Sequence, residues 1–107
     1  MTPQEKQWHV FDAEGRERKI VADQTLAEQL ADNLNGVVIM TIPHQVILVD
    51  HVPSCNFCSE PGEYDFPTRM GPWANGCEKH WIQYRTSAKL GTGMGQKWVQ
   101  RPKYHGN

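Results

Sequence analysis

Alternating polar and apolar side chains predict β-structure at the start of the chain. In residues 18–22 the side chains alternate between the two sides of a strand, and residues 8–11 form a second short strand-like run. These runs flank Asp12-Ala13-Glu14-Gly15, whose residue types are typical of a turn. We therefore expect a half-buried antiparallel hairpin.

A helical period replaces the strand pattern in the next segment. Leucines recur every four residues, with alanines beside two of them, and so form one apolar stripe. The stripe consists of Leu26, Leu30 and Leu34. Asp23 or Thr25 can cap the N-terminus of this helix, and Asn35-Gly36 is a typical signal for its end.

Two β-branched runs, 37–42 and 46–49, complete the first half of the chain. Only Pro43-His44-Gln45 separates them, which favours a second hairpin over one bent strand. Residues 1–52 are therefore predicted to form a ββαβ(β) unit, in which the helix lies across a small antiparallel sheet.

After residue 53 aliphatic side chains become sparse and metal-binding side chains appear in pairs. The only three cysteines and one histidine form Cys55-x2-Cys58 and Cys77-x2-His80, with 18 residues between the pairs. This spacing is typical of structural zinc sites, because two ligands three residues apart can bind one ion from a single turn of backbone. We predict that Zn²⁺ binds to Cys55, Cys58, Cys77 and His80.

The ligand pairs also predict the fold around them. Residues 62–67 and 72–74 favour a short hairpin, and the helix-forming run 78–90 starts at the second pair. A knuckle, a hairpin and a helix that carries the last two ligands make a treble clef, which we favour over a zinc ribbon for residues 53–90. The predicted fold class is α+β, with a treble-clef-like zinc lobe after the first sheet. Four protein ligands close the shell, so the metal is expected to be structural.

Residues 91–107 are expected to form a Gly-rich and then basic C-terminal tail. Residues 78–107 contain six Lys/Arg and one Asp/Glu, a net charge of +5, whereas residues 1–54 have −4 and residues 55–77 have −2. Cations interleaved with aromatic rings are typical of surfaces that bind single-stranded nucleic acid. The candidate contacts are Lys89, Lys97, Trp98, Arg101, Lys103 and Tyr104. A solvated tail with an aromatic anchor fits the pattern equally well.

Several motifs of the second half occur together in a known family. They are Cys55-x2-Cys58, Tyr64-Asp65, Thr68-x-Met70-Gly71-Pro72-Trp73-Ala74, Cys77-x2-His80 and Leu90-Gly91-Thr92-Gly93-x-Gly95-Gln96. In these motifs residues 55–96 resemble small zinc-finger proteins of bacteriophages, most of them of unknown function. The resemblance implies a zinc-held fold and a phage context. Many such proteins have Cys as the fourth ligand, where this chain has His80, and either residue completes the site.

One of the remaining histidines is an alternative metal ligand. His51 could compete with His80 for the fourth position, but the pair on the helix has the better geometry for one ion. We expect the other histidines to be solvated: His9, His44 and His105.

Two aromatic residues and a glycine-rich loop also allow a binding role. Trp73 and Trp81 could be stacking platforms for bases, but we expect both in the core around the metal, where aliphatic side chains are few. Gly91-x-Gly93-x-Gly95 could cradle a phosphate, but it follows a helix where a phosphate loop would precede one. A flexible or extended segment is the favoured interpretation.

No catalytic motif accompanies the cysteines. The sequence has no H-E-x-x-H, G-x-S-x-G or P-loop, and no deaminase signature. We therefore expect a non-catalytic zinc-binding protein that binds nucleic acid through its basic C-terminal segment. The alternative is a phage-encoded adaptor or inhibitor that binds a host or phage protein. No small-molecule substrate is expected.

Cysteine usage and hydropathy predict the compartment. An odd number of cysteines argues against a disulfide framework, and there is neither a signal-peptide pattern nor a run of roughly 18 apolar residues. The expectation is the cytoplasm, that of the host cell if a phage encodes the protein, without a membrane partner.

Overall fold

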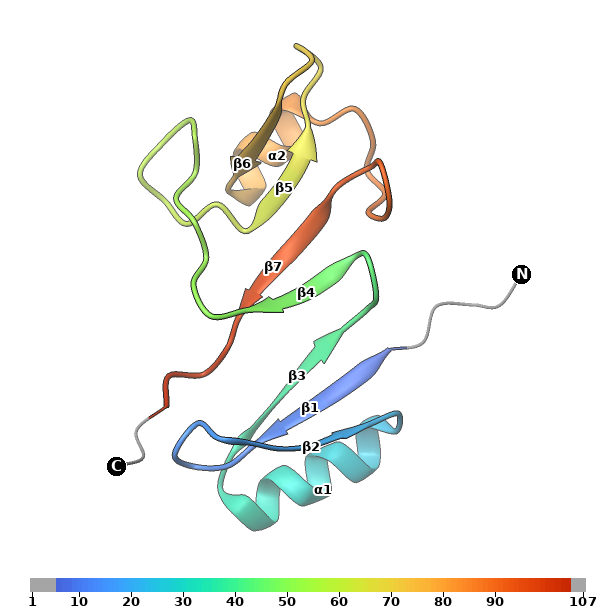
Figure 1. Ribbon diagram of the computed structural model, residues 1–107, viewed down its shortest axis with the longest axis vertical. Helices are drawn as coiled ribbons and strands as arrows, with labels where there is room; N and C mark the ends of the chain where they lie inside the picture. The colour runs from blue at the N-terminus through green and yellow to red at the C-terminus, as the bar shows by residue number, and fades with distance from the viewer. Residues whose placement is uncertain (1–5, 105–107) are drawn as a thin grey trace, which may run out of the picture. The chain divides into compact units, whose positions relative to one another are not determined.

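The computed structural model describes residues 6–104, which form seven strands and two helices (Figure 1). They divide into two compact units. The first unit contains the residues up to Pro43 together with those from Arg101 onward, and the second contains His44 to Gln100. Each unit combines a helix with a sheet, so the predicted α+β class is confirmed.

The first unit is built on a three-stranded antiparallel sheet of order β2-β1-β3. β1 (Gln7–Phe11) and β2 (Glu17–Val21) form the predicted hairpin, and β3 (Val37–Thr41) pairs with the other edge of β1. Asp12 fixes the turn of the hairpin, because its carboxylate accepts backbone hydrogen bonds from Glu14 and Arg16.

α1 (Gln24–Leu34) begins and ends where the sequence predicts. The Asp23 side chain accepts a hydrogen bond from the backbone N–H of Thr25, and Asn35 ends the helix in the left-handed conformation, with φ of 52°. Gly36 follows because a Cβ at this position would overlap the carbonyl group of Phe11.

The helix packs on the sheet through its smallest side chains. Ala27 and Ala31 are buried around Val10 of β1, and Leu30 contacts the margin of this cluster. Leu26 is exposed, so the predicted leucine stripe is wrong at its first member. The buried face is centred on the alanines because their small side chains let the helix approach the sheet closely.

The second unit contains a mixed sheet of order β4-β7-β5-β6. β4 (Val46–Val49) runs parallel to β7 (Gln96–Gln100), and β5 (Tyr64–Pro67) is antiparallel to both β7 and β6 (Trp73–Gly76). The predicted hairpin of β3 with β4 is therefore wrong, and β4 belongs to the second unit, which begins at His44. Both runs are apolar on both faces, so their side-chain pattern does not specify a partner.

The predicted C-terminal tail is wrong for residues 96–100. They form β7, which lies between β4 and β5 inside the second sheet. The glycine-rich segment before β7 is a closed turn, because the backbones of Gly91 and Gly95 exchange hydrogen bonds of 2.7 and 3.1 Å. The prediction of an extended segment is therefore wrong.

α2 (Glu78–Tyr84) packs on the β5–β6 hairpin. Its residue Trp81 forms a buried cluster with Tyr64 and Phe66. The helix starts at the second ligand pair as predicted but ends at Tyr84 and does not continue to residue 90. Across residues 6–104, neither helix is long and apolar enough to cross a membrane.

Candidate metal centre

The first two ligands lie on a tight knuckle formed by residues 53–62. Ser54 and Pro61 form an antiparallel bridge, and the backbone N–H of Cys55 donates to the Glu60 carbonyl over 2.8 Å. This closes the backbone into a narrow loop, which turns the thiols of Cys55 and Cys58 to the same side.

The last two ligands come from the start of α2. Cys77 is the N-cap residue, and its carbonyl accepts the backbone N–H of Trp81 over 2.8 Å. Its side chain makes no capping hydrogen bond, so the thiol is free to face the other ligands. His80 follows one helical turn later on the same face.

A backbone contact joins the knuckle to β6. The N–H of Asn56 donates to the carbonyl of Asn75 over 2.8 Å, and the N–H of Asn75 donates to the Asn56 side-chain oxygen over 2.6 Å. Gly76, next in β6, lies against the Phe66 ring, because a Cβ there would be 2.9 Å from the ring carbon. These contacts hold the knuckle beside the hairpin from which α2 departs.

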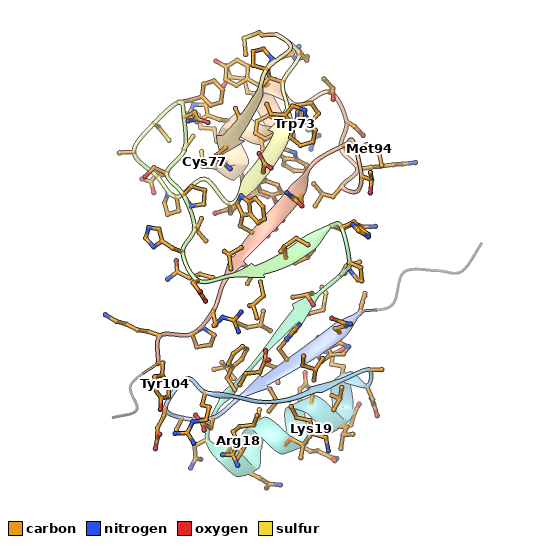
Figure 2. All side chains as sticks on the ribbon, viewed as in Figure 1. Arg18, Lys19, Trp73, Cys77, Met94 and Tyr104 are labelled. Carbon is orange, nitrogen blue, oxygen red and sulfur yellow. The ribbon has the colours of Figure 1, made fainter. Side chains whose placement is uncertain are left out.

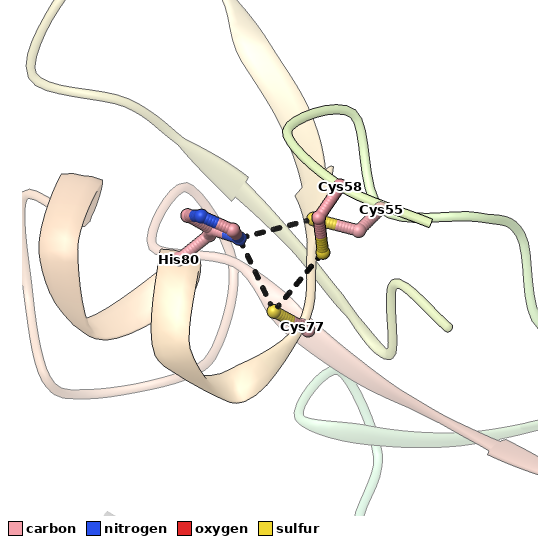
Figure 3. A group of neighbouring side chains, drawn as sticks. All are labelled: Cys55, Cys58, Cys77 and His80. Atoms are coloured by element: carbon pink, nitrogen blue, oxygen red, sulfur yellow. Dashed lines mark hydrogen bonds between the residues drawn. The ribbon is translucent and has the colours of Figure 1, made fainter. Parts of the chain in front are cut away.

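The four ligand atoms converge on one point (Figure 3). The sulfur atoms of Cys58 and Cys77 are 3.8 Å apart, and the Nδ1 atom of His80 is 3.5 Å from Cys55 Sγ and 3.3 Å from Cys77 Sγ. All four atoms lie within 4.8 Å of one another. A tetrahedral zinc ion with bonds of about 2.3 Å to sulfur and about 2.0 Å to nitrogen has S···S edges of about 3.8 Å and S···N edges of about 3.5 Å. The group can therefore bind one metal ion and is compatible with zinc.

The electrostatics of the group favour a cation. Burial opposes ionisation of Cys55, but hydrogen bonds from the backbone N–H groups of Cys77 and Phe57 and from the side chains of Cys58 and His80 together outweigh this effect, so the pKa of the Cys55 thiol falls from 9.0 to about 6. For Cys58 the backbone N–H of Glu60 favours the thiolate, but desolvation and the adjacent cysteines raise its pKa. One thiolate therefore forms readily, and further negative charge beside it requires a positive ion.

Aromatic rings surround the ligands on the side of α2. Phe57, between the two knuckle cysteines, stacks on Tyr84 with ring centroids 4.6 Å apart and lies 5.4 Å from the His80 ring. Its backbone N–H also donates to Cys55 Sγ over 3.4 Å. Sequence reasoning missed this role, although an aromatic residue between paired cysteines was the available signal.

The other histidines lie outside the ligand group. His51 and His44 are exposed, and neither joins the cluster found within residues 6–104. The prediction that His9 is solvated is wrong: it is buried, its Nδ1 is 2.9 Å from Glu17, and its Nε2 is 2.8 Å from Thr41. His9 alternates with Val10 and so lies on the face of β1 opposite α1, where β2 and β3 supply its polar partners; the sequence of one strand does not reveal such partners.

His105 lies outside the described residues. Of the two tryptophans expected in the core, Trp81 is buried as predicted, and its ring stacks on Tyr64 with centroids 4.1 Å apart. Trp73 is 51% exposed, so that prediction is wrong. β6 is the outer strand of its sheet, and among residues 6–104 β5 is the one strand that pairs with it.

The six residues expected to contact nucleic acid do not belong to one unit. In the second unit, the Lys97 ammonium group lies 5.4 Å from the centroid of the Tyr64 ring, Trp98 is half-buried in β7, and Lys89 is exposed. In the first unit, three others follow β7: Arg101, Lys103 and Tyr104.

Two of those three residues contact β2 or the turn before it. The Arg101 guanidinium is 3.8 Å from the Glu17 carboxylate, and the Tyr104 hydroxyl accepts a hydrogen bond from Arg16 over 3.2 Å. Lys103 is exposed. The division into units also balances the charges: the first has six Lys/Arg and seven Asp/Glu, and the second has five of each. Neither unit therefore has a large net charge.

A comparison of the chain with known protein families, curated proteins and solved structures finds no match. The resemblance to phage zinc-finger proteins accordingly stays a prediction, and the geometry of the Cys3His group carries the functional argument.

Proposed function

We propose that Cys55, Cys58, Cys77 and His80 bind one Zn²⁺ ion that stabilises the second unit. The observation that carries this proposal is the agreement between the distances that separate the ligand atoms and the edges of a zinc tetrahedron. Since all four ligands come from the protein, no position is left for water or substrate, and the role of the ion is structural and not catalytic.

The order of elements supports a treble-clef-like classification. The knuckle at residues 53–62 is followed by the β5–β6 hairpin and then by α2, whose first turn carries the last two ligands. The ion would join the knuckle to the helix. This cross-link takes the place of an extensive aliphatic core, as it does in other small zinc-dependent folds.

Elemental analysis of protein purified without chelator tests the metal. One zinc per chain is expected for the wild type, and iron is measured in parallel because a thiolate-rich tetrahedron also accepts iron. Cys58→Ser should lose the ion, whereas His51→Ala should retain it, because His51 lies outside the ligand group. Loss of zinc in both variants, or its absence from the wild type, would contradict the proposal.

For the biological role, we infer a protein-binding adaptor or inhibitor. The near-balance of charge in both units gives little attraction for phosphate. The second unit instead exposes large apolar side chains close together, among them Phe57, Met70 and Trp73. The resemblance of residues 55–96 to phage zinc-finger proteins makes a host protein the favoured partner.

Nucleic-acid binding is the rival function, through Lys89, Lys97, Trp98, Arg101, Lys103 and Tyr104. It is supported by the exposed Tyr104 ring and the exposed lysines. Capture of partners from a bacterial lysate with and without nuclease distinguishes the two functions, since a protein partner is retained after nuclease treatment. Direct binding of an oligonucleotide with a slope of log K against log salt of about −3 to −5 would instead establish the rival.

A further inference from the structure

An apolar groove lies beside the metal knuckle at the edge of the second sheet. Its cavity of about 410 Å³ includes Phe57, Met70 and Trp73 in its lining, and none of the residues that line it is charged. Trp73 belongs to β6 (Figure 2). Met70 is 61% exposed, so the groove presents apolar surface to solvent.

The backbone of β6 is open at the same place. Within an antiparallel pair, the backbone groups of successive residues point alternately toward the partner strand and away from it. Asn75 directs its N–H and C=O to Asn56 of the knuckle and hence away from β5. Trp73, two residues earlier, must direct its backbone groups to the same outer edge.

The residue opposite Trp73 agrees with this alternation. Trp73 pairs with Pro67, which has no N–H to donate across the pair. The N–H of Thr68 donates to the carbonyl of Pro72 over 3.2 Å, as expected for the adjacent hydrogen-bonded pair. The alternation directs the backbone groups of Trp73 away from β5, and no hydrogen bond from them to a turn, loop or knuckle residue is found within residues 6–104, so they form a short, unpaired strand edge beside the groove.

We propose that this edge binds an extended peptide segment that carries an apolar side chain. The segment adds to β6 as a further strand and exchanges main-chain hydrogen bonds with Trp73. These bonds use the same outer edge of β6 as the contact between Asn56 and Asn75. Its apolar side chain fills the groove between Phe57, Met70 and Trp73. This inference rests on the proposed adaptor function and specifies the kind of partner.

The size and charge of the groove select this occupant. Seven residues line it, far fewer than the roughly 20–30 residues that each partner contributes to a stable interface between folded chains. A second copy of this chain would need a larger surface. The uncharged lining complements a neutral apolar segment and offers no positive charge to a phosphate backbone.

Selection from a library of short random peptides tests the proposal on the zinc-loaded full chain. Selected peptides should share an apolar residue and bind in an extended conformation. Their binding should slow hydrogen exchange at the Trp73 backbone N–H. Met70→Glu should lower the affinity of the selected peptides by about tenfold or more, because it places a charge in the apolar contact. The matched control is Ile82→Glu on α2, since Ile82 is 54% exposed but does not line the groove. It should bind as the wild type does.

Several outcomes would overturn the proposal. These are equal binding by Met70→Glu, unchanged exchange at Trp73, or failure to select any peptide. Oligothymidylate binding that Met70→Glu abolishes would make the occupant a nucleic acid, and self-association that it abolishes would make it a second copy. Zinc content is measured on the same samples, so failure of the metal proposal is recognised separately from failure of the peptide proposal.

Discussion

The two units of this protein have different kinds of core. In the first, Val10 and Phe11 are fully buried, and alanines of α1 pack against the sheet. Among the described residues of the second, those with buried apolar side chains are Cys55, Tyr64, Phe66 and Trp81, and none is aliphatic. The first unit follows the usual rule of aliphatic burial, whereas the second combines stacked rings with four converging ligands.

This difference shows how one short chain can support two sheets. The helix of the first unit packs on one face of its sheet around Val10, and none of the described residues of this unit belongs to the metal-ligand group. The knuckle of the second unit contacts β6 through the Asn56–Asn75 hydrogen bonds and α2 through the Phe57–Tyr84 stack, and the ligand group would add a cross-link between the knuckle and α2. We therefore expect metal removal to affect the units unequally.

Removal of the metal with a strong chelator should produce the largest effect. Apparent binding energies of structural zinc are about 10–16 kcal/mol, which equals or exceeds the stability of a typical domain. Backbone amide NMR signals of residues 53–84 should lose their dispersion, while those of β1, β2 and β3 should remain. Simultaneous loss in both units, or no loss in either, would show that the comparison is wrong.

Phe11→Ala tests the other unit. It removes a fully buried ring and should lower the free energy of unfolding of the first unit by about 3–5 kcal/mol, with zinc content unchanged. Phe66→Ala makes the same chemical change in the second unit. Denaturant unfolding followed by NMR signals from each unit should assign each loss to the unit that carries the substitution; a loss shared by both units would contradict the prediction.

His9→Ala should have a smaller effect, again confined to the first unit. The substitution leaves the buried hydroxyl of Thr41 and the carboxylate of Glu17 without the imidazole that joins them. A loss of about 1–3 kcal/mol is expected from unfolding curves. Glu17→Gln keeps an oxygen acceptor at the same position and should cost less; equal losses would mean that the hydrogen bond is not what stabilises this site.

Local patterns predicted much of the fold. The β1–β2 hairpin, the ends of α1 and the β5–β6 hairpin follow from alternation, capping residues and turn chemistry close in sequence. The pairing of β4 with β7 could not be predicted in this way, because the two strands are far apart in the chain and both faces of β4 are apolar. That pairing also explains why the supposed tail is a central strand.

The candidate site was the more predictable part. The spacing of the Cys55-x2-Cys58 and Cys77-x2-His80 pairs named four candidate ligands, and the structure brings these four side chains together without His51. The roles of Phe57 and Asn56 depend on contacts with α2 and β6, which the spacing does not specify. The exposure of Trp73 likewise depends on its place on an outer strand.

X-ray absorption at the zinc edge tests the closed ligand shell most directly. Protein purified with its native metal should show three sulfur atoms at about 2.3 Å and one nitrogen atom at about 2.0 Å, supplied by Cys55, Cys58, Cys77 and His80. A shell that lacks one sulfur and contains an oxygen from water would mean that the site is open. That result, or the absence of bound zinc, would contradict a structural metal centre.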